Sequence, residues 1–472
     1  MPAPPKSAAI SNILLRLFSF CVLVLLARFA YVITVKGQCC ESIDFCFFPQ
    51  TTISEADATH LRRSHYASIF RNLITEGFLS KNSNSLCIAT PEGFEIDALK
   101  EIGVASTIQL AEGFNQTFKN HTFDFIFSSG VGLDWISRQV QCAFEVSRIL
   151  KPGGYFVVHT ESASDAYGFN SLLQLVDTFT LINSHEIIDG LDSSLSWELV
   201  FKKDDKIFSH TEKGQTYNGM IDRECSVPRH KLELIENAEP LIEEEPLKPW
   251  IELKRNIKNV KYLSKMVDIS FKNRYVYIDV GARSYGSSIG GWFKKQYPKQ
   301  EKPFEIYAVE ADSVFHKEYT LTKGVTLLPY AAWIRNETLF FEISREPRRK
   351  NKERRGRGMG RVRPVQPASN FISDSNKIKG FDFAKWLKSS VTNRDYVVVK
   401  MDIEGSEFHV IPRLIETRAA CLIDEMFVEC HYNRWERCCP GKRSPKHHKT
   451  YAQCLELFSS LRRVGVLVHQ WW

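Results

Sequence analysis

The sequence lacks two features. None of its twelve cysteines are in Cys-x-x-Cys spacing, and it has no long low-complexity run. The first absence argues against a structural zinc site, and the second against a largely disordered chain. A net positive charge is also missing outside one segment. Ten Lys/Arg against two Glu in Arg345–Arg363 give +8, so the net charge of +7 leaves −1 for the remaining residues. We therefore expect neither a metal site nor a nucleic-acid partner.

The length of 472 residues is too great for one ordinary hydrophobic core. We expect two globular domains, residues 55–203 and 256–472, after an N-terminal tail, anchor and stem at 1–54. Glu233–Pro249 is acidic and interrupted by proline, so residues 204–255 are interpreted as an exposed acidic linker.

The N-terminal segment carries a targeting signal. Leu17–Val35 is almost entirely apolar and approaches the roughly 20 residues that span a bilayer. Lys6 and Arg16 precede it, which favours a cytoplasmic N-terminus. Arg28 lies inside the segment, and a cleaved signal peptide is the alternative, although no A-x-A cleavage site follows. We expect a single-pass signal anchor in the Golgi or another endomembrane, with the domains in the lumen.

Glycosylation sequons and cysteines bear on the same compartment. The three Asn-x-Thr sequons are at Asn115, Asn120 and Asn336. Five cysteines crowd the last fifty-odd residues: Cys421, Cys430, Cys438, Cys439 and Cys454. In an oxidising lumen the asparagines would carry glycans and the cysteines would pair, whereas in cytosol they would stay thiols. We expect disulfides rather than metal here, such as one from Cys438 or Cys439 to Cys454.

Short apolar strands alternate with helical patterns in both expected domains. In the first, strands are expected at 85–90, 107–110, 123–129 and 155–159, and helices at 57–77, 95–102 and 138–150. In the second, strands are expected at 275–281, 306–312, 396–402, 423–429 and 464–469, with a helix from Phe381. This alternation predicts an α/β fold with two doubly wound, Rossmann-like sheets.

Polar residues and glycines follow two strands of the second domain. Asp279 ends the first strand, and the turn after it contains Gly281, Ala282 and Gly286. Glu310 follows the next strand, where an acid can accept both ribose hydroxyls of a nucleoside. These residues predict a nucleoside-cofactor site at the carboxyl edge of the sheet. The alternative is a tight turn beside an ordinary surface acid.

Residues 270–435 resemble the FkbM-type S-adenosylmethionine-dependent methyltransferases. The matching segments are Ile278-Asp-Val-Gly-Ala, Ala308-Val-Glu-Ala-Asp, Phe381-Asp-Phe-Ala-Lys-Trp-Leu, Val399-Lys-Met-Asp-Ile-Glu-Gly-Ser-Glu and Phe427-Val-Glu. The resemblance implies a class I methyltransferase fold and S-adenosyl-L-methionine as cofactor. It places Asp279, Gly281 and Glu310 at the cofactor, and Lys400, Asp402 and Glu404 near the transferred methyl group. Arg283-Ser-Tyr-Gly departs from the family's Asn-x-Gly turn. The whole chain also resembles plant endomembrane proteins described as methyltransferase-like.

Methyl transfer to a hydroxyl group needs an in-line approach, a dry site and removal of a proton. Asp402, Glu404, Glu407 or His431 could act as the base. Alternatively, Glu404 and Glu407 merely complement the N-terminus of a helix.

The second half of the first domain resembles that of a small-molecule methyltransferase, but the first half lacks the residues expected to bind the cofactor. Ala89-Thr-Pro-Glu-Gly stands where a glycine-rich turn is expected, and the strand ending at Gln109 and Leu110 is followed by no acid before Glu112. We interpret this domain as a degenerate, non-catalytic scaffold.

The sequence thus favours O-methylation of a glycan, polysaccharide or other hydroxyl acceptor in the lumen. The alternative is an inactive, methyltransferase-like scaffold for other membrane enzymes. Arg345–Arg363 is interpreted as a solvated, mobile loop; a functional loop would bind an anionic partner such as an acidic polysaccharide, a lipid headgroup or RNA.

Overall fold

The computed structural model describes residues 55–88, 92–104, 106–110, 118–129, 139–162, 164–188, 195–204, 227–344, 359–364, 377–436 and 441–471. The contacts divide the chain into a short unit, Met1–Ala58, and a unit with all three sheets, Thr59–Trp472. The expected anchor, Leu17–Val35, lies outside the described residues. In the described ranges, no helix has the length and apolar character needed to cross a bilayer.

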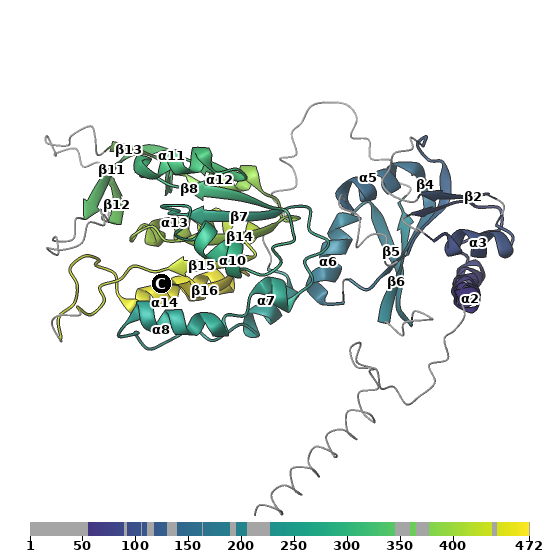
Figure 1. Ribbon diagram of the computed structural model, residues 1–472, viewed down its shortest axis with the longest axis horizontal. Helices are drawn as coiled ribbons and strands as arrows, with labels where there is room; N and C mark the ends of the chain where they lie inside the picture. The colour runs from purple at the N-terminus through teal and green to yellow at the C-terminus, as the bar shows by residue number, and fades with distance from the viewer. Residues whose placement is uncertain are drawn as a thin grey trace, which may run out of the picture. The chain divides into compact units, whose positions relative to one another are not determined.

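The first domain is a mixed six-stranded sheet of order β2-β1-β3-β4-β6-β5 (Figure 1). Its strands are β1 (Asn84–Ile88), β2 (Ser106–Leu110), β3 (Phe123–Ser128), β4 (Leu150–Thr160), β5 (Phe179–Ile188) and β6 (Leu195–Lys203). Its helices are α2 (Glu55–Thr75), α3 (Phe94–Glu101), α5 (Gln139–Ile149) and α6 (Ala166–Leu175). Strands β1 to β4 run parallel, as predicted, and β6 lies antiparallel between β4 and β5.

The second domain is a six-stranded sheet of order β16-β15-β14-β7-β8-β9, with all neighbours parallel. Its strands are β7 (Tyr275–Val280), β8 (Phe304–Val309), β9 (Val325–Leu328), β14 (Tyr396–Met401), β15 (Glu425–Glu429) and β16 (Leu467–Trp471). Its main helices are α11 (Ser313–Leu321), α12 (Phe383–Ser390), α13 (Glu407–Glu416) and α14 (Tyr451–Arg463). Shorter helical turns are α9 (Leu263–Met266), η3 (Ile289–Phe293), α10 (Lys294–Gln296) and η5 (Ala419–Leu422). Numbered within the domain, the order is 3-2-1-4-5-6, so the expected doubly wound, Rossmann-like fold is confirmed, and the order reverses between β7 and β14.

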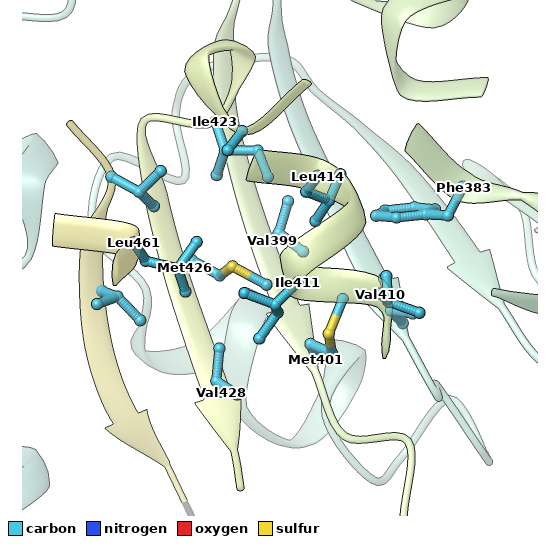
Figure 2. Packing of buried hydrophobic residues seen from close by; sticks show 14 of the residues in the cluster. Phe383, Val399, Met401, Val410, Ile411, Leu414, Ile423, Met426, Val428 and Leu461 are labelled. Carbon is cyan, nitrogen blue, oxygen red and sulfur yellow. The ribbon is translucent and has the colours of Figure 1, made fainter. Parts of the chain in front are cut away.

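The central strand β14 is buried along its whole length because helices cover both faces of the sheet. Val399 and Met401 pack with β15 side chains beneath Ile411 and Leu414 of α13 (Figure 2). Tyr396 and Val398 face the opposite layer. Burial on both faces explains why this strand is a continuous apolar run that ends in one lysine and one methionine.

A four-stranded sheet of order β10-β13-β11-β12 is inserted after β9. Its strands are β10 (Ala331–Trp333), β11 (Glu337–Ser344), β12 (Met359–Pro364) and β13 (Lys377–Asp382). The interpretation of Arg345–Arg363 as one solvated loop is therefore wrong at its end, because β12 pairs with β11. Within β12, Arg361 donates to the Lys446 carbonyl at 2.5 Å and to Glu342 at 3.1 Å. Residues 345–358 lie outside the described ranges.

The predicted linker is not an exposed spacer in its second half. It contains α7 (Arg229–Glu236) and α8 (Pro249–Asn256), followed by the turn η2 (Ile257–Asn259). Between the helices, Glu239 is buried against His469 of β16, at 2.5 Å from its Nδ1 atom. Arg443 binds Glu245 through two nitrogens, at 3.0 and 2.9 Å. These acidic residues are therefore contacts of the second domain.

One described disulfide joins Cys430, just after β15, to Cys454 in α14. The expected pairing of Cys454 with Cys438 or Cys439 is therefore wrong. Cys421 is also disulfide-bonded, whereas Cys87 and Cys142 are buried thiols.

Candidate active site

A cavity of about 580 Å³ lies beyond the carboxyl ends of β7, β8 and β14, where the strand order reverses. Five of the predicted site residues line it: Gly281, Glu310, Lys400, Asp402 and Glu404. Glu310, which is expected to bind the ribose, and Asp402, which is expected to lie near the methyl group, thus line the same cavity.

Asp279 lies beneath the cavity, fully buried at the end of β7. Ser288 donates a short hydrogen bond to its Oδ2 atom, and Lys400 Nζ lies 3.5 Å from Oδ1. Burial raises the pKa of Asp279 above its usual value, and Lys400 opposes that shift. Burial alone would lower the pKa of Lys400, but Asp279 and Asp402 outweigh it and raise this pKa. The pair fixes the ends of two adjacent strands.

Gly281 has a left-handed backbone, with φ of 83°. A Cβ atom at this position would collide with the backbone carbonyl oxygen of Asp402. The resemblance places this glycine at the cofactor, and Gly281 does line the cavity; the structure shows that it also makes room for the backbone of Asp402. Gly281 therefore sets the distance between the β7 and β14 ends.

Two other predicted cofactor residues do not line the cavity. Ala282 is buried in the core, where its carbonyl accepts hydrogen bonds from Ser287 and Tyr319. Gly286 lies outside the lining residues, and a Cβ atom added there would meet no heavy atom within 4 Å. Arg283, between them, does line the cavity and has a φ of 53°.

Glu310 is held at the carboxyl end of β8 by two backbone amides. Arg283 N donates to its Oε2 atom and Asp312 N to its Oε1 atom, each at 2.6 Å. Burial raises the pKa of Glu310, and these amide hydrogen bonds oppose the rise. Each carboxylate oxygen retains a second lone pair that can accept a hydroxyl hydrogen.

Asp402 and Glu404 follow β14 on the other side of the cavity. The Asp402 side chain is 25% exposed, and its Oδ2 atom lies 3.6 Å from Lys400 Nζ. Glu404 is buried with a φ of 51° and accepts a hydrogen bond from Lys446 Nζ at 2.7 Å. Both carboxylates face the cavity, so both remain candidates for proton transfer.

His431 and Glu407 lie behind this wall and do not line the cavity. Glu407 Oε1 accepts hydrogen bonds from the His431 backbone at 2.7 Å and approaches Nδ1 at 3.1 Å. Burial alone would lower the pKa of His431, but Glu407 and neighbouring carboxylates raise it to about 10. His431 itself does not line the cavity, so its predicted role as base has no direct contact with a bound acceptor.

Sequence reasoning missed several residues of the site. Glu429, at the end of β15, lies 3.7 Å from His431 Nε2. Burial and then Asp402 raise the pKa of Glu429 to about 7. Glu429 does not line the cavity, but residues of the inserted sheet and several aromatic residues do, among them Tyr330, Phe341, Gly360, Val362, Trp292 and Trp471. Among these missed residues, only Glu429 could have been recognised from the local sequence, because an acid at the end of a buried strand is unusual.

The corresponding edge of the first domain carries different groups. Gly93 has a φ of 75°, and a Cβ atom there would lie 3.4 Å from Gln109 Oε1. His159 Nε2 lies 2.7 Å from Glu198 Oε2 in a buried pair. Burial raises the pKa of the nearby Glu95. Glu112 lies outside the described residues.

Comparisons with known proteins add two family matches. Residues 77–262 match the family described as "Putative S-adenosyl-L-methionine-dependent methyltransferase". Residues 235–339 and 362–472 match "Domain of unknown function (DUF7870)". The methyltransferase match thus falls on the first domain and reaches only the start of the second.

Individual relatives cover parts of the chain. "Probable methyltransferase PMT4" of Arabidopsis thaliana is 27% identical over 129 residues, which are 27% of this chain and 20% of that protein. The chain therefore spans about a fifth of that relative's length. A putative methyltransferase from Bacillus halodurans is 13% identical and covers 29% of this chain and 99% of its own, with a TM-score of 0.24. A putative sarcosine dimethylglycine methyltransferase from Galdieria sulphuraria is 14% identical and covers 30% and 87%, also with a TM-score of 0.24.

These matches do not test the FkbM-like subtype or the individual site residues. They do confirm the broader prediction for part of the chain: residues 77–262 are similar to S-adenosylmethionine-dependent methyltransferases, and S-adenosylmethionine is the cofactor that this similarity implies.

Proposed function

We propose that the second domain binds S-adenosylmethionine in the cavity beyond β7, β8 and β14 and transfers its methyl group to an oxygen acceptor. One observation carries the proposal: Glu310 and Asp402 line the same cavity, at the point where the strand order reverses. The volume of about 580 Å³ is within the usual range of small-molecule sites. Open α/β sheets bind their ligands at such a point.

Glu310 would hold the ribose, because its two oxygens are fixed by amides and each can still accept a hydroxyl hydrogen. The methyl group would then lie toward Asp402 and Glu404. In the reaction, the acceptor oxygen forms a bond to the methyl carbon while the sulfonium–carbon bond breaks. The electron pair of the broken bond would stay on sulfur, which gives S-adenosylhomocysteine. The hydroxyl proton of the acceptor would pass to Asp402 or Glu404.

The FkbM-like subtype, a glycan acceptor and a lumenal site at a Golgi or related membrane belong to the same proposal. Motif order supports the first. The disulfide between Cys430 and Cys454 supports an oxidising compartment. The apolar segment Leu17–Val35 supports a membrane anchor. An acidic acceptor would complement the basic residues of 345–363.

A second candidate follows from the methyltransferase match at residues 77–262. In this alternative the first domain binds the cofactor and the second is a scaffold. Against it, β2 ends at Gln109 and Leu110 without the acid that would hold the ribose. We therefore propose that the first domain is the degenerate one.

Titration of the full 472-residue chain with S-adenosylhomocysteine tests these proposals. The wild type should bind one equivalent saturably. Glu310→Gln should raise the Kd at least tenfold, because hydrogen bonds to a charged group contribute about 1.5–3 kcal/mol each. Isothermal titration calorimetry measures both values.

Glu305→Gln is the matched control, since Glu305 is on the same strand but pairs with Arg274 away from the cavity. Its Kd should stay within twofold of the wild type. A circular dichroism melt shows whether each variant is folded. If the wild type binds and Glu310→Gln binds equally well, the cofactor site would be in the first domain. If the wild type shows no saturable binding, the protein would be an inactive scaffold.

A further inference from the structure

A second cluster of ligand-competent atoms lies beside the cavity, beyond the ends of β14 and β15. Asp402, Glu404 and His431 each present one such atom, and these atoms all lie within 4.8 Å of one another. His431 Nε2 is 3.6 Å from Asp402 Oδ1, 3.7 Å from Glu404 Oε2 and 3.7 Å from Glu429 Oε1. One imidazole nitrogen therefore faces three carboxylates.

These separations are too long for hydrogen bonds, which join nitrogen and oxygen at about 2.7–3.2 Å. They suit atoms that share a cation, because two ligands each about 2.1 Å from one ion stand roughly 3–4 Å apart. The cluster therefore has the spacing of a coordination sphere rather than of a hydrogen-bond network.

The orientation of the imidazole is fixed from behind. Glu407, which is fully buried, lies 3.1 Å from His431 Nδ1 and also accepts the backbone N–H of the same residue. A carboxylate that accepts the proton of one ring nitrogen leaves the lone pair of the other nitrogen for a metal. Nε2 is thus the ligand atom, and it is the nitrogen that faces the carboxylates.

Two buried polar atoms in the cluster have no hydrogen-bond partner among the described residues. They are Glu404 Oε1 and His447 Nε2. His447 is 6% exposed, and its Nε2 atom lies 3.8 Å from Glu404 Oε2. His447 is not one of the first three residues, so its buried Nε2 atom, which has no hydrogen-bond partner among the described residues, is a further observation, and a cation bound by Glu404 would satisfy it.

Two lysines provide positive charge next to these carboxylates. Lys446 Nζ binds Glu404, and its side chain is 33% exposed, so it can turn toward solvent when an ion arrives. Lys400 contacts the other oxygen of Asp402, Oδ2 at 3.6 Å, and leaves Oδ1 facing His431.

We propose that Asp402, Glu404 and His431 bind a divalent first-row transition-metal ion, with Glu429 as a fourth ligand. Mixed imidazole and carboxylate ligands favour Mn²⁺ or Zn²⁺ over Ca²⁺ and Mg²⁺, which prefer oxygen alone. Asp402 and Glu404 also line the cavity, so the ion can coordinate an oxygen of a bound acceptor. This role in catalysis rests on the proposed function, whereas metal binding itself does not.

Metal binding is measured on the full chain after dialysis against EDTA. Calorimetric titrations with Mn²⁺ and Zn²⁺ should show one site, and Mg²⁺ and Ca²⁺ should bind at least tenfold more weakly. His431→Gln and Glu404→Gln should each raise the Kd for Mn²⁺ at least tenfold. Pulsed electron paramagnetic resonance of bound Mn²⁺ should show coupling to a ring nitrogen that is lost in His431→Gln.

His409→Gln is the matched histidine control, because His409, which is in α13, packs against Trp333 of β10 and is not part of the cluster. Its Kd should remain within twofold. The proposal is overturned if wild type binds neither Mn²⁺ nor Zn²⁺ stoichiometrically, or if folded Glu404→Gln keeps the wild-type affinity. Metal binding without binding of S-adenosylhomocysteine would reject the proposed methyl transfer alone.

Discussion

At the scale of single residues, the site depends on where two strand ends meet. Gly281 N donates to the Val309 carbonyl at 2.9 Å, and Asp402 N donates to the Val280 carbonyl at 2.9 Å. These bonds extend the sheet by one residue beyond β7 and β14 and bring the Asp402 carbonyl against the Gly281 α-carbon. The lack of a side chain on Gly281 therefore determines where Asp402 and its carboxylate lie.

Gly281→Ala should destabilise the protein by about 3 kcal/mol, from the left-handed backbone and the collision with Asp402. It should also weaken binding of S-adenosylhomocysteine, because Asp402 must move. Urea unfolding and calorimetry measure the two effects.

Gly286→Ala is the paired control in the same turn. A methyl group at this position meets no heavy atom within 4 Å, and its φ is not left-handed. Both stability and affinity should stay near wild type. If the two variants behave alike, the explanation from the Asp402 contact is wrong.

At the scale of elements, a covalent bond holds the end of β15 to α14. Cys430 separates Glu429 from His431, and its partner Cys454 lies 24 residues further along the chain. The loop between them contains Lys446 and His447, which approach Glu404. The disulfide thus ties together both segments of chain that complete the cluster beyond β14.

Replacing both cysteines, as Cys430→Ser with Cys454→Ser, should lower the free energy of unfolding by about 3 kcal/mol, because the bond closes a loop of this length. Urea unfolding under oxidising conditions measures the loss. With reductant present, the variant and wild type should become nearly equal, since neither then has the bond. A difference that persists in reductant would show that the serines, rather than the missing bond, destabilise the fold.

Elements buried on both faces could be predicted from the sequence, and others could not. Tyr396–Val399 is an unbroken apolar run, so the strand that contains it was predicted correctly. Lys377–Asp382 mixes lysine, glycine and aspartate and sits in a small inserted sheet, so no periodicity marked it. The edge acids Glu310 and Asp402 could be assigned to one site because parallel strands end at the same side of a sheet.

The way in which the site residues come together could not be predicted, because it depends on contacts distant in sequence. Asp402, Glu404 and His431 were considered as alternative bases, but their convergence appears only when β14 and β15 lie side by side. His447 comes from a loop whose position no local pattern specifies.

At the scale of the whole molecule, Glu239 of the acidic segment before the second domain is buried in that domain's core. His469 of β16 is buried between two carboxylates, with Nδ1 at 2.5 Å from Glu239 and Nε2 at 2.9 Å from Glu425. Glu425 also accepts hydrogen bonds from Tyr297 at 2.5 Å and Tyr396 at 3.3 Å. His469 therefore joins the segment after α7, through Glu239, to strand β15, through Glu425.

This arrangement makes stability depend on pH. Burial alone would lower the pKa of His469, but the two carboxylates raise it to about 9. A raised pKa means that the contribution to stability is complete below the unfolded value of about 6.5 and is lost as pH rises through about 9. The wild-type free energy of unfolding should therefore fall between about pH 6.5 and 9.5, as measured by urea unfolding.

Glu239→Gln should lower stability at about pH 6.5 by about 3 kcal/mol and flatten this pH dependence, because one partner of a buried charge is removed. Glu233→Gln is the control in the neighbouring helix, where the glutamate pairs with Arg229 at the surface. That variant should keep the wild-type slope. A Glu239→Gln variant with an unchanged slope would contradict the assignment to His469.

The walls of the cavity come from several separate parts of the chain, two of which differ in character. The ends of β7, β8 and β14 supply the carboxylates and the glycine, whereas β10 to β12 supply Phe341, Gly360 and Val362. Under the proposed function, the strand ends would hold the cofactor, whereas the inserted sheet would contact the acceptor. Exchange of residues 330–382 between homologous chains would then change the acceptor while cofactor binding stayed intact, so the insertion would be the place where evolution or engineering alters selectivity.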